Sequence, residues 1–154
     1  MKLRENYEFT GKQTALIGVL LVSILAAVLW RIRSLDGIYI IGDEFGYWAD
    51  AAFFAGKNWS EVGSMNPYYS FGYSLILAPL FLLGKPALMY KAAVLLNGVF
   101  LCGSFLLTIF CGKKLFRDLN RWNLILFSWC VNVFSSMILY AQTTLAENLI
   151  VFVF

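Results

Sequence analysis

Long apolar stretches separated by short polar connections dominate the hydropathy pattern of this chain. Four apolar segments stand out, at residues 14–30, 69–83, 92–111 and 124–140. A helix needs roughly 17–25 residues to cross a bilayer, so the first, third and fourth segments are predicted to span. The second is short and is interrupted by Gly72 and Pro79, which predicts a juxtamembrane or re-entrant helix. A further apolar run begins at Asn148 and continues to Phe154, where we expect a fourth spanning helix to start.

Composition supports the membrane class. Hydrophobic residues make up 60% of the 154 positions and charged residues only 14%, whereas a soluble domain is about half apolar and about a quarter charged. The net charge of +3 is small and no basic run interleaves with aromatic residues, so we expect no nucleic-acid partner. The chain has no histidine, which excludes imidazole bases, imidazole metal ligands and Ser-His or Cys-His nucleophiles.

The distribution of lysine and arginine predicts the orientation. The connection "GKKLFRDLNR", residues 112–121, holds four basic residues, and short loops of this kind stay in the cytoplasm. If residues 69–83 do not span, seven basic residues lie on the cytoplasmic side and five outside, and a spanning second segment would reverse these counts. We therefore expect a cytoplasmic N-terminus and an outer loop between the first two spanning helices.

These observations predict an all-α integral membrane protein with three full transmembrane helices and the start of a fourth, in the plasma membrane. Because the last apolar run stops at Phe154, we expect the chain to be the N-terminal part of a longer protein. The predicted order is a cytoplasmic N-terminus 1–13, a first spanning helix 14–30, an outer loop 31–91 with juxtamembrane helices at about 43–55 and 69–83, a second spanning helix 92–111, a cytoplasmic basic loop 112–123, a third spanning helix 124–140, an outer loop 141–147 and a truncated fourth helix 148–154.

The outer loop concentrates carboxylates. Five acids and one base, Lys57, lie between Asp36 and Glu61. Asp is a good helix N-cap and Gly a common C-terminal stop, so we expect a helix that is capped by Asp43 and ends at Gly56. A helix period places four residues on one stripe: Asp43, Tyr47, Asp50 and Phe54. This pattern is typical of an interfacial helix whose rings enter the headgroups while its carboxylates face water or a cavity. The alternative is an acidic cap on a solvated face.

Four pieces of the sequence together resemble a known family. They are Asp43-Glu44, the stretch "PYYSFGY" from Pro67 to Tyr73, the basic connection 112–121, and "TLAEN" at residues 144–148. In this order and spacing they resemble the N-terminal module of the GT-C fold glycosyltransferases, the group that includes protein O-mannosyltransferases and aminoarabinose transferases. The chain departs from the family pattern in having one proline before the juxtamembrane helix and "AEN" in place of "SEP".

The resemblance implies a cell-envelope enzyme that moves a sugar from a polyprenyl-phosphate donor to an acceptor outside the cytoplasm. It implies that Asp43 is the catalytic base, with Glu44 beside it. Arg31 and Arg33 are candidates for binding the donor phosphate, although arginines at a helix end also extend to lipid headgroups without any catalytic role.

The remaining candidates are further substrate contacts and one metal ligand. Tyr47, Asp50 and Tyr69 are the candidates for contacts with the substrate. Glu147, which opens an apolar run, is a candidate ligand for a divalent cation such as Mg²⁺ or Mn²⁺. A first-turn acid favoured by the helix dipole is the alternative for Glu147.

Two readings from other classes stay open. One is a fragment of a transporter or channel whose acidic loop binds cations, which charges inside the spanning helices would favour. Those segments carry only uncharged polar residues such as Asn97 and Asn132, which more often hold helices together. The other is a small membrane protein without catalytic activity.

Overall fold

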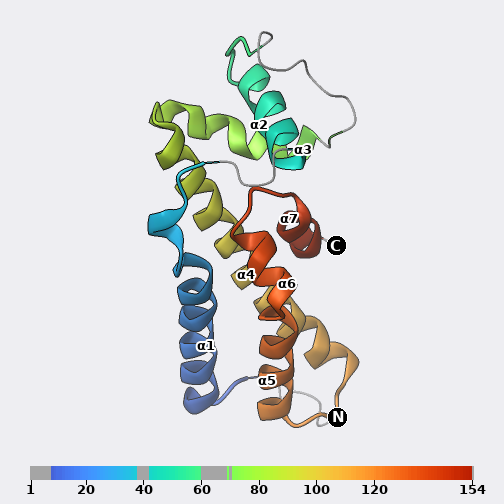
Figure 1. Cartoon of the computed structure of the whole chain (residues 1–154). Coiled ribbons are helices and arrows are strands. Elements are labelled where there is room, and N and C mark those ends of the chain that lie inside the picture. Colours follow the sequence, from blue (N-terminus) through green and yellow to red (C-terminus); the bar gives the residue numbers. More distant parts are fainter. Residues whose placement is uncertain (1–7, 38–41, 60–68, 70, 154) are drawn as a thin grey trace.

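The structure is a computed structural model of the 154-residue chain, and it describes residues 8–37, 42–59, 69 and 71–153. Every regular element in this part of the chain is helical, as the sequence predicts. In chain order the elements are α1 (Gly11–Leu29), η1 (Ile32–Ser34), α2 (Asp43–Phe54), α3 (Phe71–Leu77), η2 (Ala78–Leu83), α4 (Pro86–Leu115), α5 (Arg121–Asn132), α6 (Ser135–Ala141) and α7 (Glu147–Val153) (Figure 1).

Two helical segments are long and apolar enough to cross a membrane: Gly11–Ser34, which contains α1, and Pro86–Leu115, which is α4. The first begins with a capping box, in which Thr10 Oγ1 accepts from the Gln13 N–H and Gln13 Oε1 accepts from the Thr10 N–H at 2.9 Å. At 1.5 Å per residue α4 is about 45 Å long. It therefore extends beyond the predicted range 92–111 at both ends.

The predicted third span, residues 124–140, is not a single helix. It comprises α5 and α6, which meet at a bend of 57°. The break falls at Val133 and Phe134, where Phe134 adopts an extended conformation (φ −52°, ψ 136°) before α6 begins. Three full spans are thus reached only if this bent pair crosses as one unit. The prediction of three full spanning helices is not confirmed.

The second apolar segment forms a short helix, as its length predicts. The α3 helix continues directly into η2, and together they cover Phe71–Leu83. These 13 residues are fewer than a spanning helix needs. In Figure 1 they lie beside α2, at the end of the molecule opposite the start of α1. The stop at Gly84 is followed by Pro86, the first residue of α4.

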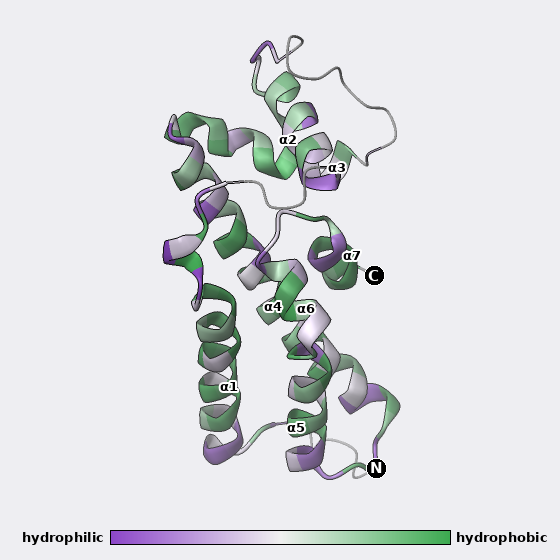
Figure 2. Ribbon diagram, in the orientation of Figure 1, coloured by the Kyte–Doolittle hydropathy of each residue, from purple (hydrophilic) through white to green (hydrophobic). Residues whose placement is uncertain are grey.

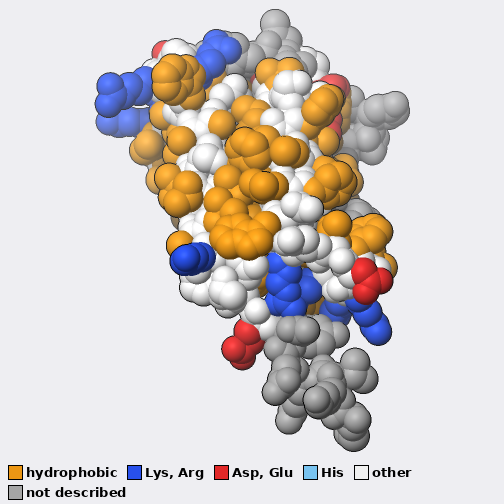
Figure 3. All heavy atoms as spheres, turned by 90° about the horizontal axis from the view of Figure 1, so that it is seen from below, with side chains coloured by type: hydrophobic (Ala, Val, Ile, Leu, Met, Phe, Trp, Pro, Cys, Tyr) orange, Lys and Arg blue, Asp and Glu red, His pale blue; other side chains and the backbone are white. Residues whose placement is uncertain are grey.

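The start of α1 and the basic connection between α4 and α5 lie at one end of the molecule. The Arg121 guanidinium donates to the Glu8 carbonyl at 2.8 Å. Lys113 and Arg121 both lie over the ring of Phe9. Figure 3, viewed onto this end, shows hydrophobic side chains across the middle of the face and Lys and Arg side chains in groups toward its edges. The helices α2 and α3 lie at the opposite end (Figure 1).

The core runs through the contacts of α4 with its neighbours. Ile24 of α1 and Leu101 and Phe105 of α4 are completely buried. The long helices are apolar along their length, and polar residues gather at their ends and connections (Figure 2). Between helices, Asn132 donates to Thr108 Oγ1 at 3.2 Å. Such side-chain pairs hold helices together where lipid gives no hydrophobic drive to pack.

Candidate functional site

The α2 helix carries most of the predicted site. Its N-cap is Gly42, so Asp43 is the first helical residue, and the prediction that Asp43 caps the helix is wrong. The helix ends at Phe54, and the predicted stop, Gly56, follows the C-cap Ala55 with a φ of +68°, a conformation that favours glycine. The Lys57 N–H donates to the Ala52 carbonyl at 2.8 Å and the Gly56 N–H to the Phe53 carbonyl at 3.0 Å, which is a Schellman motif. The C-terminal end of α2 is therefore well defined.

Glu44 lies at the centre of a buried hydrogen-bond network. Its side chain has no exposed surface. Its Oε1 accepts from the Tyr90 hydroxyl at 2.6 Å, from the Thr144 N–H at 2.5 Å and from the Thr144 hydroxyl at 2.9 Å. Thr144 Oγ1 in turn accepts from the Trp48 indole N–H at 2.9 Å. One carboxylate thus ties α2 to α4 and to the connection between α6 and α7. Because a buried charge is costly without partners, these donors stabilise the carboxylate in this position.

The connection between α6 and α7 is held by further side chains. Asn97 of α4 donates to the Thr143 carbonyl at 2.7 Å and accepts from the Tyr73 hydroxyl at 3.0 Å. Gln142 donates to the Ala27 carbonyl at the end of α1 at 3.0 Å. Residues 143–146 are buried. This short stretch therefore contacts α1, α2 and α4 at one level and fixes their relative positions.

Asp43 has the opposite environment to its neighbour. It is exposed, and its Oδ1 accepts from the Tyr69 hydroxyl at 3.0 Å. The Tyr69 ring lies directly on Gly46, where any Cβ would overlap the ring. It also meets the Tyr47 ring edge to face, with centroids 5.3 Å apart. Three of the predicted site residues, Asp43, Tyr47 and Tyr69, therefore come together on one face of α2.

Two tyrosines of this region, Tyr47 and Tyr73, have raised pKa values. Burial, then the carboxylates of Glu147 and Asp43, and then Tyr69 raise the pKa of Tyr47 above its ordinary value. Burial likewise raises the pKa of Tyr73, and the hydrogen bond to Asn97 only partly opposes it. Both rings therefore keep their protons at neutral pH and cannot act as bases there. The effect on Tyr47 also indicates that Asp43 and Glu147 approach this ring from two elements far apart in sequence.

The other predicted residues lie in different environments. Asp50 is only 2% exposed, so this carboxylate faces protein and not water. Arg31 and Arg33 are exposed at the end of α1, and neither forms an ion pair with an acid among the described residues. Glu147 is half-buried at the first position of α7. Within the described ranges no three Asp, Glu or Cys side chains come together as metal ligands. Pro67, part of the family resemblance, lies outside these ranges.

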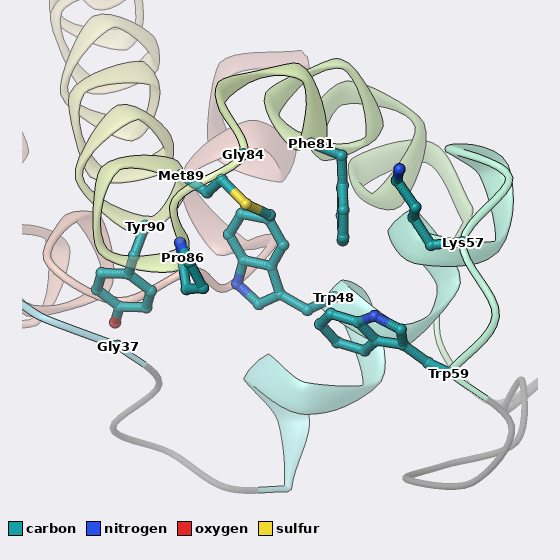
Figure 4. Close-up of a pocket in the computed structure, with 9 residues that line it drawn as sticks. All are labelled: Gly37, Trp48, Lys57, Trp59, Phe81, Gly84, Pro86, Met89 and Tyr90. Atoms are coloured by element: carbon teal, nitrogen blue, oxygen red, sulfur yellow. The ribbon is translucent and has the colours of Figure 1, made fainter.

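An aromatic cavity of about 330 Å³ lies on another side of α2. Figure 4 shows Met89 against the Trp48 indole and the Phe81 ring between Trp48 and Lys57, with Trp59 below. Phe81 meets both indoles edge to face, at centroid distances of 5.9 Å and 5.6 Å. The remaining residues that line it are Gly37, Gly84, Pro86 and Tyr90. The cavity thus shares Trp48 and Tyr90 with the Glu44 network.

Sequence reasoning missed the partners that hold Glu44. In the sequence Tyr90 lies just before an apolar segment, where aromatic residues usually anchor a helix at the membrane surface, and Thr144 lies in a short connection. The available signal was the pair Thr143-Thr144 between two apolar runs. Polar residues that must be buried between membrane helices usually have a specific partner. The partner itself, 100 residues away, has no local signature.

Comparison of the chain with protein-family models, with curated proteins and with solved structures finds no match. The residues of the chain itself are therefore the basis for any functional assignment.

Proposed function

We propose that the chain is the N-terminal module of a membrane glycosyltransferase that transfers a sugar from a polyprenyl-phosphate donor to a hydroxyl acceptor. The observation that carries the proposal is the opposite burial of two adjacent carboxylates. Glu44 is fully enclosed and Asp43 is exposed beside two tyrosines. The buried carboxylate of Glu44 can therefore fix the position of the exposed carboxylate of Asp43.

The two acids take different roles in this proposal. Glu44 has no exposed surface and contacts Tyr90 and Thr144, so it is a positioning residue that does not touch substrate. Asp43 is open to solvent and can meet an acceptor. Its hydrogen bond from Tyr69 orients one carboxylate oxygen and leaves the other available. A general base needs this combination of fixed direction and access.

In the transfer, Asp43 takes the proton of the acceptor hydroxyl as that oxygen bonds to the anomeric carbon. The bond between the anomeric carbon and the phosphate oxygen breaks, and polyprenyl phosphate leaves. A base of this kind contributes about 10²–10⁴-fold to a rate. The position of α2 suits a lipid-borne donor, because α2 lies beyond the ends of α1 and α4, at one end of the molecule (Figure 1). There a prenyl chain can stay in lipid while its sugar reaches water.

We expect the module alone not to transfer sugar, so the proposal is tested with membranes that contain the full-length protein and polyprenyl phosphate carrying one radiolabelled hexose at a time. The wild-type protein is expected to transfer label to an endogenous acceptor, and Asp43→Asn should reduce transfer at least about 100-fold. Asp36→Asn is the matched control, because Asp36 is an exposed acid of the same loop that pairs with Lys91 at 3.3 Å. Equal transfer by the two variants, or no transfer by the wild type from any donor, would contradict the proposal.

A further inference from the structure

The aromatic cavity is lined mainly by apolar side chains and has one cationic side chain, that of Lys57. The indoles of Trp48 and Trp59, the Phe81 ring and the Met89 thioether line the interior. Lys57 lines the same cavity and is exposed. A cavity of about 330 Å³ lies within the range of small-molecule sites. Its chemistry suits a ligand with an apolar body and an anionic end.

The cavity lies at the level where the two long helices end. Gly37 follows the first candidate span, which ends at Ser34. Gly84 and Pro86 stand at the start of the second. Tryptophan and tyrosine side chains concentrate at this level of a bilayer, between headgroups and acyl chains. A ligand in this position would come from the bilayer itself.

The charges around the cavity favour an anion. Lys57 is the charged residue that lines the cavity, and Lys85, which stands in the sequence between the lining residues Gly84 and Pro86, is also exposed. The nearby acids have partners of their own, since Asp36 pairs with Lys91 and Glu44 is enclosed behind Tyr90. Aromatic walls alone would also accept a quaternary ammonium group, but a lysine at the rim opposes a cationic ligand.

We propose that this cavity binds one anionic phospholipid of the surrounding bilayer, with an acyl chain against Trp48, Trp59 and Phe81 and its phosphate at Lys57. The proposal is independent of sugar transfer. A bound lipid would fill the space between α2 and the start of α4. It would hold the end of α2 opposite to the Asp43 end at the membrane surface.

The experiment uses the chain in lipid nanodiscs and measures quenching of tryptophan fluorescence by brominated acyl chains. Discs contain either brominated phosphatidylglycerol or brominated phosphatidylcholine. The signal of the cavity is the part of the quenching that Trp59→Phe removes. We expect stronger quenching by phosphatidylglycerol, and Lys57→Gln should weaken this preference about fivefold, the contribution of one lysine near an anionic lipid.

Two variants keep the result interpretable. Lys57→Arg preserves the charge and should retain the preference for phosphatidylglycerol. Lys12→Gln removes an exposed lysine at the opposite end of α1 and should also retain it. Equal quenching by the two lipids, or equal effects of Lys57→Gln and Lys12→Gln, would overturn the proposal. It would also be overturned if polyprenyl phosphate at a few per cent of the lipid removed the quenching, since the cavity would then belong to the sugar donor.

Discussion

Replacement of Glu44 by methionine should destabilise the fold strongly, because it removes an acceptor from buried donors. Methionine has a similar length but cannot replace the carboxylate. The N–H and hydroxyl of Thr144, a residue with no exposed surface, then lose the acceptor that they share. Each buried donor left unsatisfied costs about 1–3 kcal/mol, so the two together cost about 2–6 kcal/mol. Native proteins have only about 5–15 kcal/mol of stability in total.

Glu44→Gln provides the matched comparison. The amide oxygen of glutamine can accept from the same donors, so this variant loses the contribution of the charge and keeps the hydrogen bonds. Hydrogen bonds to a charged group are about twice as strong as neutral ones, which predicts a loss of about 1–2 kcal/mol. Asp43→Asn, one residue earlier and exposed, should change stability little.

The assay is reversible unfolding of the purified protein in mixed micelles by titration with a denaturing detergent. Tryptophan emission is a suitable signal, since the Trp48 indole donates to Thr144 within the same network. The expected order of unfolding free energies is wild type, then Glu44→Gln, then Glu44→Met. If Glu44→Met unfolded within about 1 kcal/mol of wild type, the premise that orphaned buried donors are costly here would be refuted.

Two further predictions concern the tyrosines beside the acids. Gly46→Ala should lower the unfolding free energy by about 1–3 kcal/mol, because its Cβ would displace the Tyr69 ring. Gly18→Ala, at a helical glycine with open space around it, should not lower stability, and equal losses would contradict the packing argument. Tyr73 keeps its proton in the folded chain above its ordinary pKa of 10.0, whereas the unfolded chain loses it. Stability should therefore fall by about 1.4 kcal/mol per pH unit above pH 10, and Tyr73→Phe should flatten this slope in titrations between pH 9 and 11.

The elements that depend on local pattern could be predicted. An uninterrupted apolar run of sufficient length must satisfy its backbone internally in lipid, which requires a helix, and α1 and α4 follow this rule. The stop at Gly56 follows from the left-handed conformation that glycine tolerates. The break between α5 and α6 could not be predicted. No glycine or proline marks residues 124–140, and the apolar pattern continues through Val133 and Phe134.

The exposure of Asp43 and the burial of Glu44 could not be predicted from the sequence either. The two side chains have the same chemistry and adjacent positions, and successive residues of a helix point about 100° apart. Which of the two side chains is buried depends on the hydrogen-bond donors that the rest of the protein places beside α2. These donors come from Tyr90 and Thr144, 46 and 100 positions further along the chain. Their meeting is a property of the tertiary packing.

The hydrogen bonds between Glu44 and Thr144 have a consequence for how the protein folds during its synthesis. When α2 emerges, the residue that completes its carboxylate has not yet been synthesised, since 100 positions separate the two. During that interval the acid must remain hydrated. The first loop can adopt its finished form only after α4, α5 and α6 have been made. Synthesis runs from the N-terminus, but the contact between Glu44 and Thr144 can form only when the later segment reaches the earlier one.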